Sequence, residues 1–137
     1  MSQYEQLKKL NMSTKDKYQG VLTLGEKLGI KDGDVSEEGG ILKIKGKANT
    51  PFEKDLLWDK IKELGGENPS DIKANITVAD DSVYHRHIVK SGDSLSKIAK
   101  HYYGDPMKYK KIFEANTNIL KNPDVIHPDQ VLVIPKI

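Results

Sequence analysis

The chain of 137 residues contains no cysteine, which excludes disulfide bonds, thiolate metal sites, a cysteine nucleophile and a lipidated cysteine. Small extracellular domains often depend on disulfides, so this absence favours a reducing compartment. The first ten residues lack the apolar segment and the small-residue cleavage site of a secretory signal. No stretch is apolar over the length that is needed to cross a bilayer. We therefore expect a cytoplasmic protein without a membrane partner.

The chain also lacks an excess of charge of either sign. Its 22 basic and 20 acidic residues leave a formal net charge of only +2. Such a balance gives no broad field that would attract nucleic acid or an anionic membrane. Lys43, Lys45 and Lys47 form a basic strand face, but without interleaved aromatic residues this stripe is weak evidence for nucleic-acid binding. We expect no nucleic-acid partner.

Sequence signatures of catalysis are missing as well. No nucleophile elbow, P-loop or zinc-protease helix occurs in the sequence. The adjacent carboxylates at 37–38 and at 80–81 cannot face one substrate bond from two sides, as acid–base catalysis requires. His85 and His87 would share one face of a strand. Nothing nearby completes a zinc site, so we interpret His87 as a packed strand residue. We expect neither an enzyme nor a transition-metal site.

What the chain does contain is the pattern of two small domains. Only 36% of its residues are hydrophobic, which suits two small cores better than one large core. In the first half, three patterns define the elements. Apolar residues at helical spacing mark helices, alternating apolar and polar residues mark strands, and glycine or proline marks their ends. They are a helix over 18–28, a turn at 31–34, a short strand around 35, a strand over 41–46, a helix over 51–64 and a strand over 72–78.

This order of helix, strand, strand, helix and strand, with the hairpin sequence Gly-Gly-Ile-Leu-Lys-Ile-Lys-Gly, resembles a BON domain. One departure from the family pattern is visible. Asn-Pro-Ser-Asp-Ile, at 68–72, stands where the family usually has a Gly-Val pair at the entry to the last strand. The resemblance implies an α+β domain over 16–80. The preceding residues 1–15 carry few apolar anchors, and we expect an N-terminal arm there, either loose or a short helix.

The second half opens at His87 with His-Ile-Val-Lys-Ser-Gly-Asp-Ser-Leu-Ser-Lys-Ile-Ala. It closes at Pro135 with Asn-Pro-Asp-Val-Ile-His-Pro-Asp-Gln-Val-Leu-Val-Ile-Pro. Helical spacing predicts two amphipathic helices in between, and the apolar run at 131–134 predicts a central partner strand. Both ends and their spacing resemble a LysM domain, with a strand-helix-helix-strand plan over 84–137. The buried helix stripes are expected at Leu95, Ile98, Ala99 and Tyr102, and at Tyr109, Ile112 and Phe113.

The LysM resemblance implies a shallow groove in which secreted members of the family bind N-acetylglucosamine chains. Sugar faces need apolar contacts and acetamido groups need backbone partners, which such a groove offers. This chain has Asp129 where the family favours glycine, and its loop at 116–127 is longer than in typical glycan-binding members. A LysM fold without a glycan site is the alternative. The implied walls are Gly92, Asp93, Ser94 and Leu95 on one side, and Asn122, Pro123, Asp124, Val125, Ile126, His127 and Pro128 on the other.

A BON-like domain followed by a LysM domain resembles the small bacterial cytoplasmic potassium-binding proteins, in which both domains act together. This resemblance implies selective K⁺ binding, a coupled change in domain arrangement, and no organic cofactor. A large, weakly hydrated cation is best selected by several carbonyl oxygens that replace its water shell, and it needs no carboxylate cluster. We expect the ion at the backbone carbonyls of a glycine-rich turn formed by Gly65, Gly66, Glu67 and Asn68.

Two other functions are open at this stage. One is LysM-mediated binding of peptidoglycan or another N-acetylglucosamine glycan, against which the lack of an export signal argues. The other is a structural interaction module within a larger assembly. We expect a monomer whose partner is potassium or a glycan.

Overall fold

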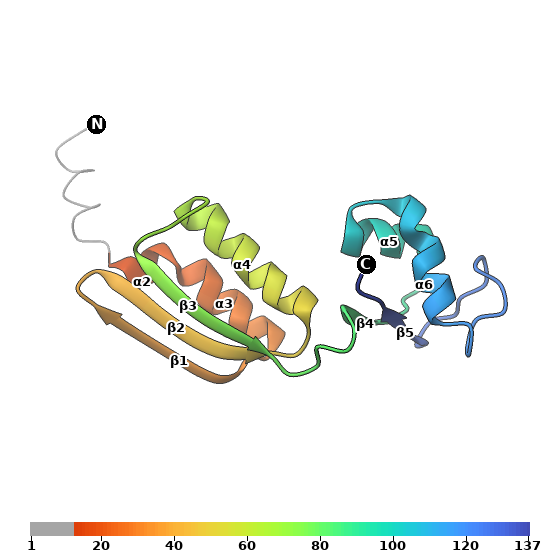
Figure 1. The fold of residues 1–137 in the computed structure, drawn as a ribbon, viewed down its shortest axis with the longest axis horizontal. Helices are drawn as coiled ribbons and strands as arrows, with labels where there is room; N and C mark the ends of the chain where they lie inside the picture. Colours follow the sequence, from red (N-terminus) through yellow and green to blue (C-terminus); the bar gives the residue numbers. More distant parts are fainter. Residues whose placement is uncertain (1–12) are drawn as a thin grey trace. The chain divides into compact units, whose positions relative to one another are not determined.

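The computed structural model describes residues 13–137, and Figure 1 shows the course of the chain. The chain divides into two compact units, each with its own hydrophobic core. The first unit contains the described residues up to Asn49, together with Glu53–Ala79. The second contains Thr50–Phe52 and Asp80–Ile137. Helices and strands occur in both units, which confirms the α+β class.

Within the described residues, the first unit contains two principal helices and a three-stranded sheet. Strand order is β1-β2-β3, with β1 antiparallel to β2 and β2 parallel to β3, so that α4 is the crossover between the two parallel strands. The predicted order of helix, strand, strand, helix and strand is confirmed. Its elements are α2 (Thr14–Lys17), α3 (Gln19–Leu28), β1 (Lys31–Glu38), β2 (Ile41–Ala48), α4 (Pro51–Gly65) and β3 (Ile72–Val78).

The core of the first unit lies between one face of the sheet and the helices α3 and α4 (Figure 1). The helices contribute the apolar residues that the sequence places at helical spacing, and the strands contribute alternate residues. Gly29 ends α3 in the left-handed conformation, as its position in the sequence predicts. The buried core residues are Tyr18, Val21, Leu42, Ala48, Leu57, Ile61, Ile72 and Ile76.

The predicted turn at 31–34 is wrong, because these residues begin the eight-residue strand β1. The register of β1 against β2 shifts between Lys31 and Asp34, and Asp32 has a positive φ of 53°. The turn-forming residues therefore make an irregularity within the strand, which bends it without ending its pairing.

The predicted N-terminal arm over 1–15 falls mostly on residues 1–12, which lie outside the described residues. Its last residues belong to a helix start, because the Ser13 side chain accepts a hydrogen bond from the backbone N–H of Asp16 and caps α2.

The second unit has the predicted strand-helix-helix-strand order. Its two strands pair antiparallel, and its helices supply most of the remaining core. The Asp105 side chain caps the second helical segment, which begins as a 3₁₀ turn before it becomes α-helical. The elements are β4 (His85–Ile88), α5 (Leu95–Tyr103), η1 (Pro106–Lys108), α6 (Tyr109–Ala115) and β5 (Val131–Ile134). The buried core residues are Val89, Leu95, Ile98, Ala99, Ile112, Leu120, Leu132 and Ile134.

The sequence predicts a central strand at 131–134. In the described structure this run is instead one strand of a two-stranded sheet. Leu132 and Ile134 are buried, whereas Val131 on the other face is 51% exposed beside Ile88, which is 57% exposed. An uninterrupted apolar run therefore does not require burial of both faces here. Within residues 13–137, no helix combines the length and the apolar character that crossing a membrane requires.

Candidate functional site

One candidate site lies in the second unit, where the chain turns from β4 into α5. Gly92 has a positive φ of 88°, a conformation that glycine adopts without strain. The Ser94 side chain then accepts a hydrogen bond of 3.2 Å from the backbone N–H of Lys97 and caps α5. This turn places the predicted residues Asp93, Ser94 and Leu95 at the amino-terminal end of the helix.

The opposite wall comes from the loop before β5. The Asn122 side-chain oxygen accepts a hydrogen bond of 2.8 Å from the Asp124 N–H, which forms a local turn of the kind that asparagine favours. Asp129 has a φ of 74°. This left-handed conformation favours glycine, and aspartate is among the other residues that adopt it most readily.

These two walls enclose a groove of about 270 Å³. Its volume is near the lower end of the range that is common for small-molecule sites. Six of the eleven residues predicted for the groove line it, which brings together two segments almost thirty positions apart in the sequence. The lining residues are Asp93, Ser94, Leu95, Ser96, Tyr109, Pro123, Asp124 and Ile126.

Ser96 and Tyr109 line the groove although the sequence does not predict them there. Tyr109 belongs to the predicted buried stripe of its helix and packs against the core, but the ring is only half-buried. The sequence feature that could have predicted this contact is an aromatic residue in the first turn of the second helix. The predicted residues that do not line the groove are Gly92, Asn122, Val125, His127 and Pro128.

A hydrogen-bonded network lies behind the Asp93 wall. The two ring nitrogens of His87 lie 2.7 Å from the Tyr102 hydroxyl and 2.9 Å from Asp93 Oδ2. Asp93 Oδ2 also accepts a 2.8 Å hydrogen bond from the backbone N–H of Lys90. The hydrogen bond from His87, and then that from Lys90, hold the pKa of Asp93 below its usual value. The network fixes the orientation of the Asp93 carboxylate at the groove.

The same network accounts for His87. Its side chain is largely buried and both ring nitrogens have protein partners, so that it is the packed strand residue that the sequence predicts. Burial, with a smaller contribution from the Asp93 charge, raises the pKa of Tyr102 to about 12. Tyr102 is therefore a neutral hydroxyl group at physiological pH. Among residues 13–137, no group of three or more histidine, aspartate or glutamate side chains could hold a metal ion.

A second candidate site is the loop that follows α4 in the first unit. Gly66 has a φ of 90°, and its N–H donates to the Lys62 carbonyl at 2.8 Å, which closes the last turn of the helix. Gly66, Glu67 and Asn68 are exposed. The carboxyl end of a helix carries a partial negative charge on its last carbonyl groups. The loop predicted to bind an ion therefore starts in a region of negative potential.

Gly65, the last residue of α4, packs against a buried tyrosine. Tyr18 is fully buried, and a Cβ atom at Gly65 would lie 2.1 Å from its hydroxyl oxygen. The hydroxyl donates to Asp71 Oδ1 at 2.5 Å, and the Lys17 ammonium lies 2.6 Å from Asp71 Oδ2. Burial would raise the pKa of Asp71, but the hydrogen bonds from Lys17 and Tyr18 outweigh it and lower that pKa. A side chain larger than that of glycine at position 65 would therefore clash with Tyr18.

Comparison with known families identifies part of the second unit. Residues 87–135 match the model of the LysM domain. This segment is a LysM domain. The groove between the start of α5 and the loop before β5 lies within this segment.

Two curated relatives extend the comparison. The chain is 39% identical over 116 residues to an uncharacterized protein of Deinococcus radiodurans, a match that covers 74% of this chain and 44% of the relative. It is 58% identical over 50 residues to the Potassium binding protein Kbp of Escherichia coli, a match that covers 36% of this chain and 34% of the relative. The chain thus spans less than half the length of either relative.

Proposed function

We propose that the chain is a non-enzymatic protein that selectively binds K⁺. The observation that carries this proposal is the 58% identity over 50 residues with a protein named as potassium-binding. The first unit supports it, because its order of helix, strand, strand, helix and strand is that of the BON-like domain expected beside the LysM domain.

For the ion we propose the backbone carbonyls of the loop from Gly65 to Asn68. The carboxyl end of α4 supplies a partial negative charge without a formal one. The nearby Asp71 carboxylate already accepts from Lys17 and Tyr18. The loop also carries the exposed Glu67 side chain, and the proposed ligands are its neutral backbone carbonyl oxygens. Such oxygens suit a large monovalent cation better than a small divalent one. We also propose that binding changes the arrangement of the two units.

Thermal unfolding in KCl and in NaCl at matched ionic strength tests this function. If K⁺ binds only the folded protein, a concentration of 100 times Kd stabilises it by about 2.7 kcal/mol. For a unit of this size that corresponds to a rise in Tm of roughly 10–20 °C. We expect the rise in KCl and not in NaCl. Coincident unfolding curves in the two salts, at up to several hundred millimolar, would exclude selective K⁺ binding.

The LysM groove favours a second function, the binding of a glycan that contains N-acetylglucosamine. The groove has apolar walls from Leu95, Pro123 and Ile126, the half-buried ring of Tyr109, and polar groups at Asp93 and Ser94. This mixture of one aromatic face, small apolar contacts and fixed hydrogen-bonding groups suits an acetylated sugar. Both functions can reside in one chain, because the two candidate sites lie in different units.

A groove-filling substitution tests the glycan function without removing a core residue. Ser96→Trp places a large side chain at an exposed position on the groove wall. We expect it to weaken binding of an N-acetylglucosamine tetramer at least tenfold in a calorimetric titration. Lys100→Trp, on an exposed position of the same helix outside the groove, is the matched control and should bind normally. The glycan function is wrong if the unmodified protein binds no tetramer at millimolar concentration.

Cytoplasmic location and the monomeric state stay predictions of the sequence. They bear on the choice between the two functions, since a glycan of the cell wall requires a protein outside the cytoplasm.

A further inference from the structure

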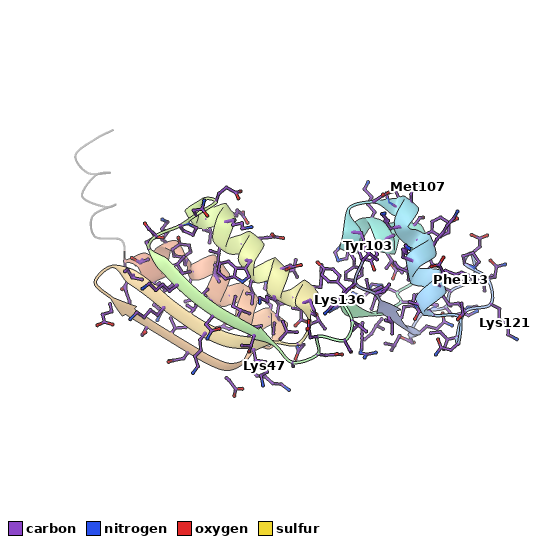
Figure 2. The ribbon with its side chains drawn as sticks, viewed as in Figure 1. Lys47, Tyr103, Met107, Phe113, Lys121 and Lys136 are labelled. Atoms are coloured by element: carbon purple, nitrogen blue, oxygen red, sulfur yellow. The ribbon has the colours of Figure 1, made fainter. Side chains whose placement is uncertain are left out.

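The sheet of the first unit has one face that no described helix covers. The helices α3 and α4 pack on the opposite face (Figure 1). Along β2 and β3 the side chains alternate, so that Leu42 and Ile72 point into the core while the lysines between the buried positions are exposed. Figure 2 shows Lys47 on the side of the sheet away from the helices. The exposed lysines of the two strands are Lys43, Lys45, Lys47 and Lys73.

Strand register brings these lysines into one cluster. Lys43 lies directly opposite Lys73 in the parallel pair, and Lys47 lies opposite Lys31 in the antiparallel pair. Side chains that lie opposite each other project from the same face. Neighbouring lysines are about 7 Å apart along β2 and about 5 Å apart across the strands. We call these five residues, Lys31, Lys43, Lys45, Lys47 and Lys73, the lysine face.

Acidic side chains neutralise the lysine face only in part. Glu38 forms an ion pair of 3.2 Å with Lys43, and Asp34 lies opposite Lys45 in the register. Among the residues that the register places on this face, two carboxylates thus oppose five ammonium groups. Like charges placed directly opposite each other on a sheet destabilise it, so the arrangement lowers the stability of the free protein. An anionic partner would remove this repulsion.

We propose that the lysine face binds a linear phosphate polymer that carries no bases, for which inorganic polyphosphate is the probe. Three lysines in a row along β2 match a chain of regularly spaced charges. Asn75 lies on the same face, opposite Lys45, and its side-chain amide is a typical donor to phosphate oxygens. Thr77 lies opposite Lys47, but its hydroxyl donates to the Gly46 carbonyl at 3.4 Å. The net charge of the whole chain, only +2, does not reveal this local excess of positive charge.

Two other anionic partners fit the face less well. Single-stranded nucleic acid gains much of its affinity from bases that stack on aromatic rings. On the described strands β1 to β3 no aromatic residue occurs. An anionic bilayer is held firmly only when lysines are joined by an apolar anchor. Val35, the large exposed apolar residue of β1, lies opposite Ile44, which packs on the helix-covered face.

A triple substitution tests the proposal on the full chain. Lys45→Gln, Lys47→Gln and Lys73→Gln remove three charges from the face but keep the ion pair of Lys43. Binding of fluorescent polyphosphate is measured between 50 and 300 mM salt, with oligothymidylate and phosphatidylglycerol vesicles as the other probes. The control is Lys108→Gln, Lys110→Gln and Lys111→Gln, three exposed lysines of the second unit that give the same change in net charge.

We expect the triple variant to bind polyphosphate at least tenfold more weakly, with a slope of log K against log salt that is lower by about 2. It should also unfold at the same or a higher temperature than the unmodified protein, because repulsion has been removed. The control should change affinity less than twofold. Equal losses in the two variants, unchanged binding in the first, or tighter binding of oligothymidylate or vesicles than of polyphosphate would each overturn the proposal.

Discussion

Replacement of Asn116 by leucine is expected to unfold the LysM domain. Asn116 is 2% exposed, and its side-chain amide donates to the Ile112 carbonyl at 2.7 Å and to the Val133 carbonyl at 2.8 Å. Its oxygen accepts from the Val133 N–H at 2.8 Å. One side chain thus satisfies three backbone groups and joins α6 to the strand β5. Leucine has a similar volume but would leave these groups without partners.

Each buried polar group without a partner costs about 1–3 kcal/mol, so we expect Asn116→Leu to lower the free energy of unfolding by roughly 3–5 kcal/mol. At roughly 0.05–0.15 kcal/mol per residue, a domain of this size has a total stability of only about 3–9 kcal/mol. The measurement is urea unfolding followed by far-ultraviolet circular dichroism. Asn118→Leu, at an exposed position two residues away, is the control and should change the free energy by less than about 0.5 kcal/mol. A small effect of Asn116→Leu would show that the side chain does not hold β5.

Gly65→Ala is expected to destabilise the first unit by about 3 kcal/mol. The added Cβ would lie 2.1 Å from the Tyr18 hydroxyl oxygen and 3.0 Å from Pro69 Cβ. Moving the fully buried tyrosine breaks its hydrogen bond to Asp71, which is worth about 1.5–3 kcal/mol when one partner is charged. Repacking the core around an extra methyl group costs a further 1–3 kcal/mol or so.

The fluorescence of Trp58 reports this effect selectively, because it is the only tryptophan and packs against the core of the first unit. Gly25→Ala is the matched control, since a Cβ there would meet Ile30 Cγ1 at an ordinary distance of 3.6 Å. It should be neutral or stabilising, as alanine generally is within a helix. The double variant Tyr18→Phe with Gly65→Ala removes the clashing oxygen, so its loss should be smaller than the sum of the single losses.

The sequence predicts most of this fold, because local signals and tertiary packing agree. The helix Pro51–Gly65 begins with proline and ends at a pair of glycines, and its buried Leu57 and Ile61 stand at helical spacing. Strand β1 is the exception. All eight of its residues are exposed, so it lacks the apolar alternation that marks a strand. Residues 31–38 form a strand only because they pair with β2. The local sequence does not reveal which segments pair.

The candidate sites are less predictable, for two physical reasons. A carbonyl-lined ion site uses backbone atoms that every residue has, so it leaves almost no pattern of side chains. Contacts between distant segments are hidden as well, as the hydrogen bonds of His87 with Asp93 and Tyr102 show. The LysM motif located two walls of the groove, but the contribution of Tyr109 depends on how α6 packs against them.

The central claim, that a potassium ion binds the loop after α4, is tested most directly by a nuclear magnetic resonance titration of the ¹⁵N-labelled chain. KCl replaces NaCl stepwise at constant total salt, so that only the identity of the cation changes. We expect saturable shifts of the amide signals of Gly66, Glu67 and Asn68, with smaller shifts at the groove residues Ser94 and Ser96. Spectra that stay the same throughout the exchange, or shifts confined to the LysM groove, would contradict the account.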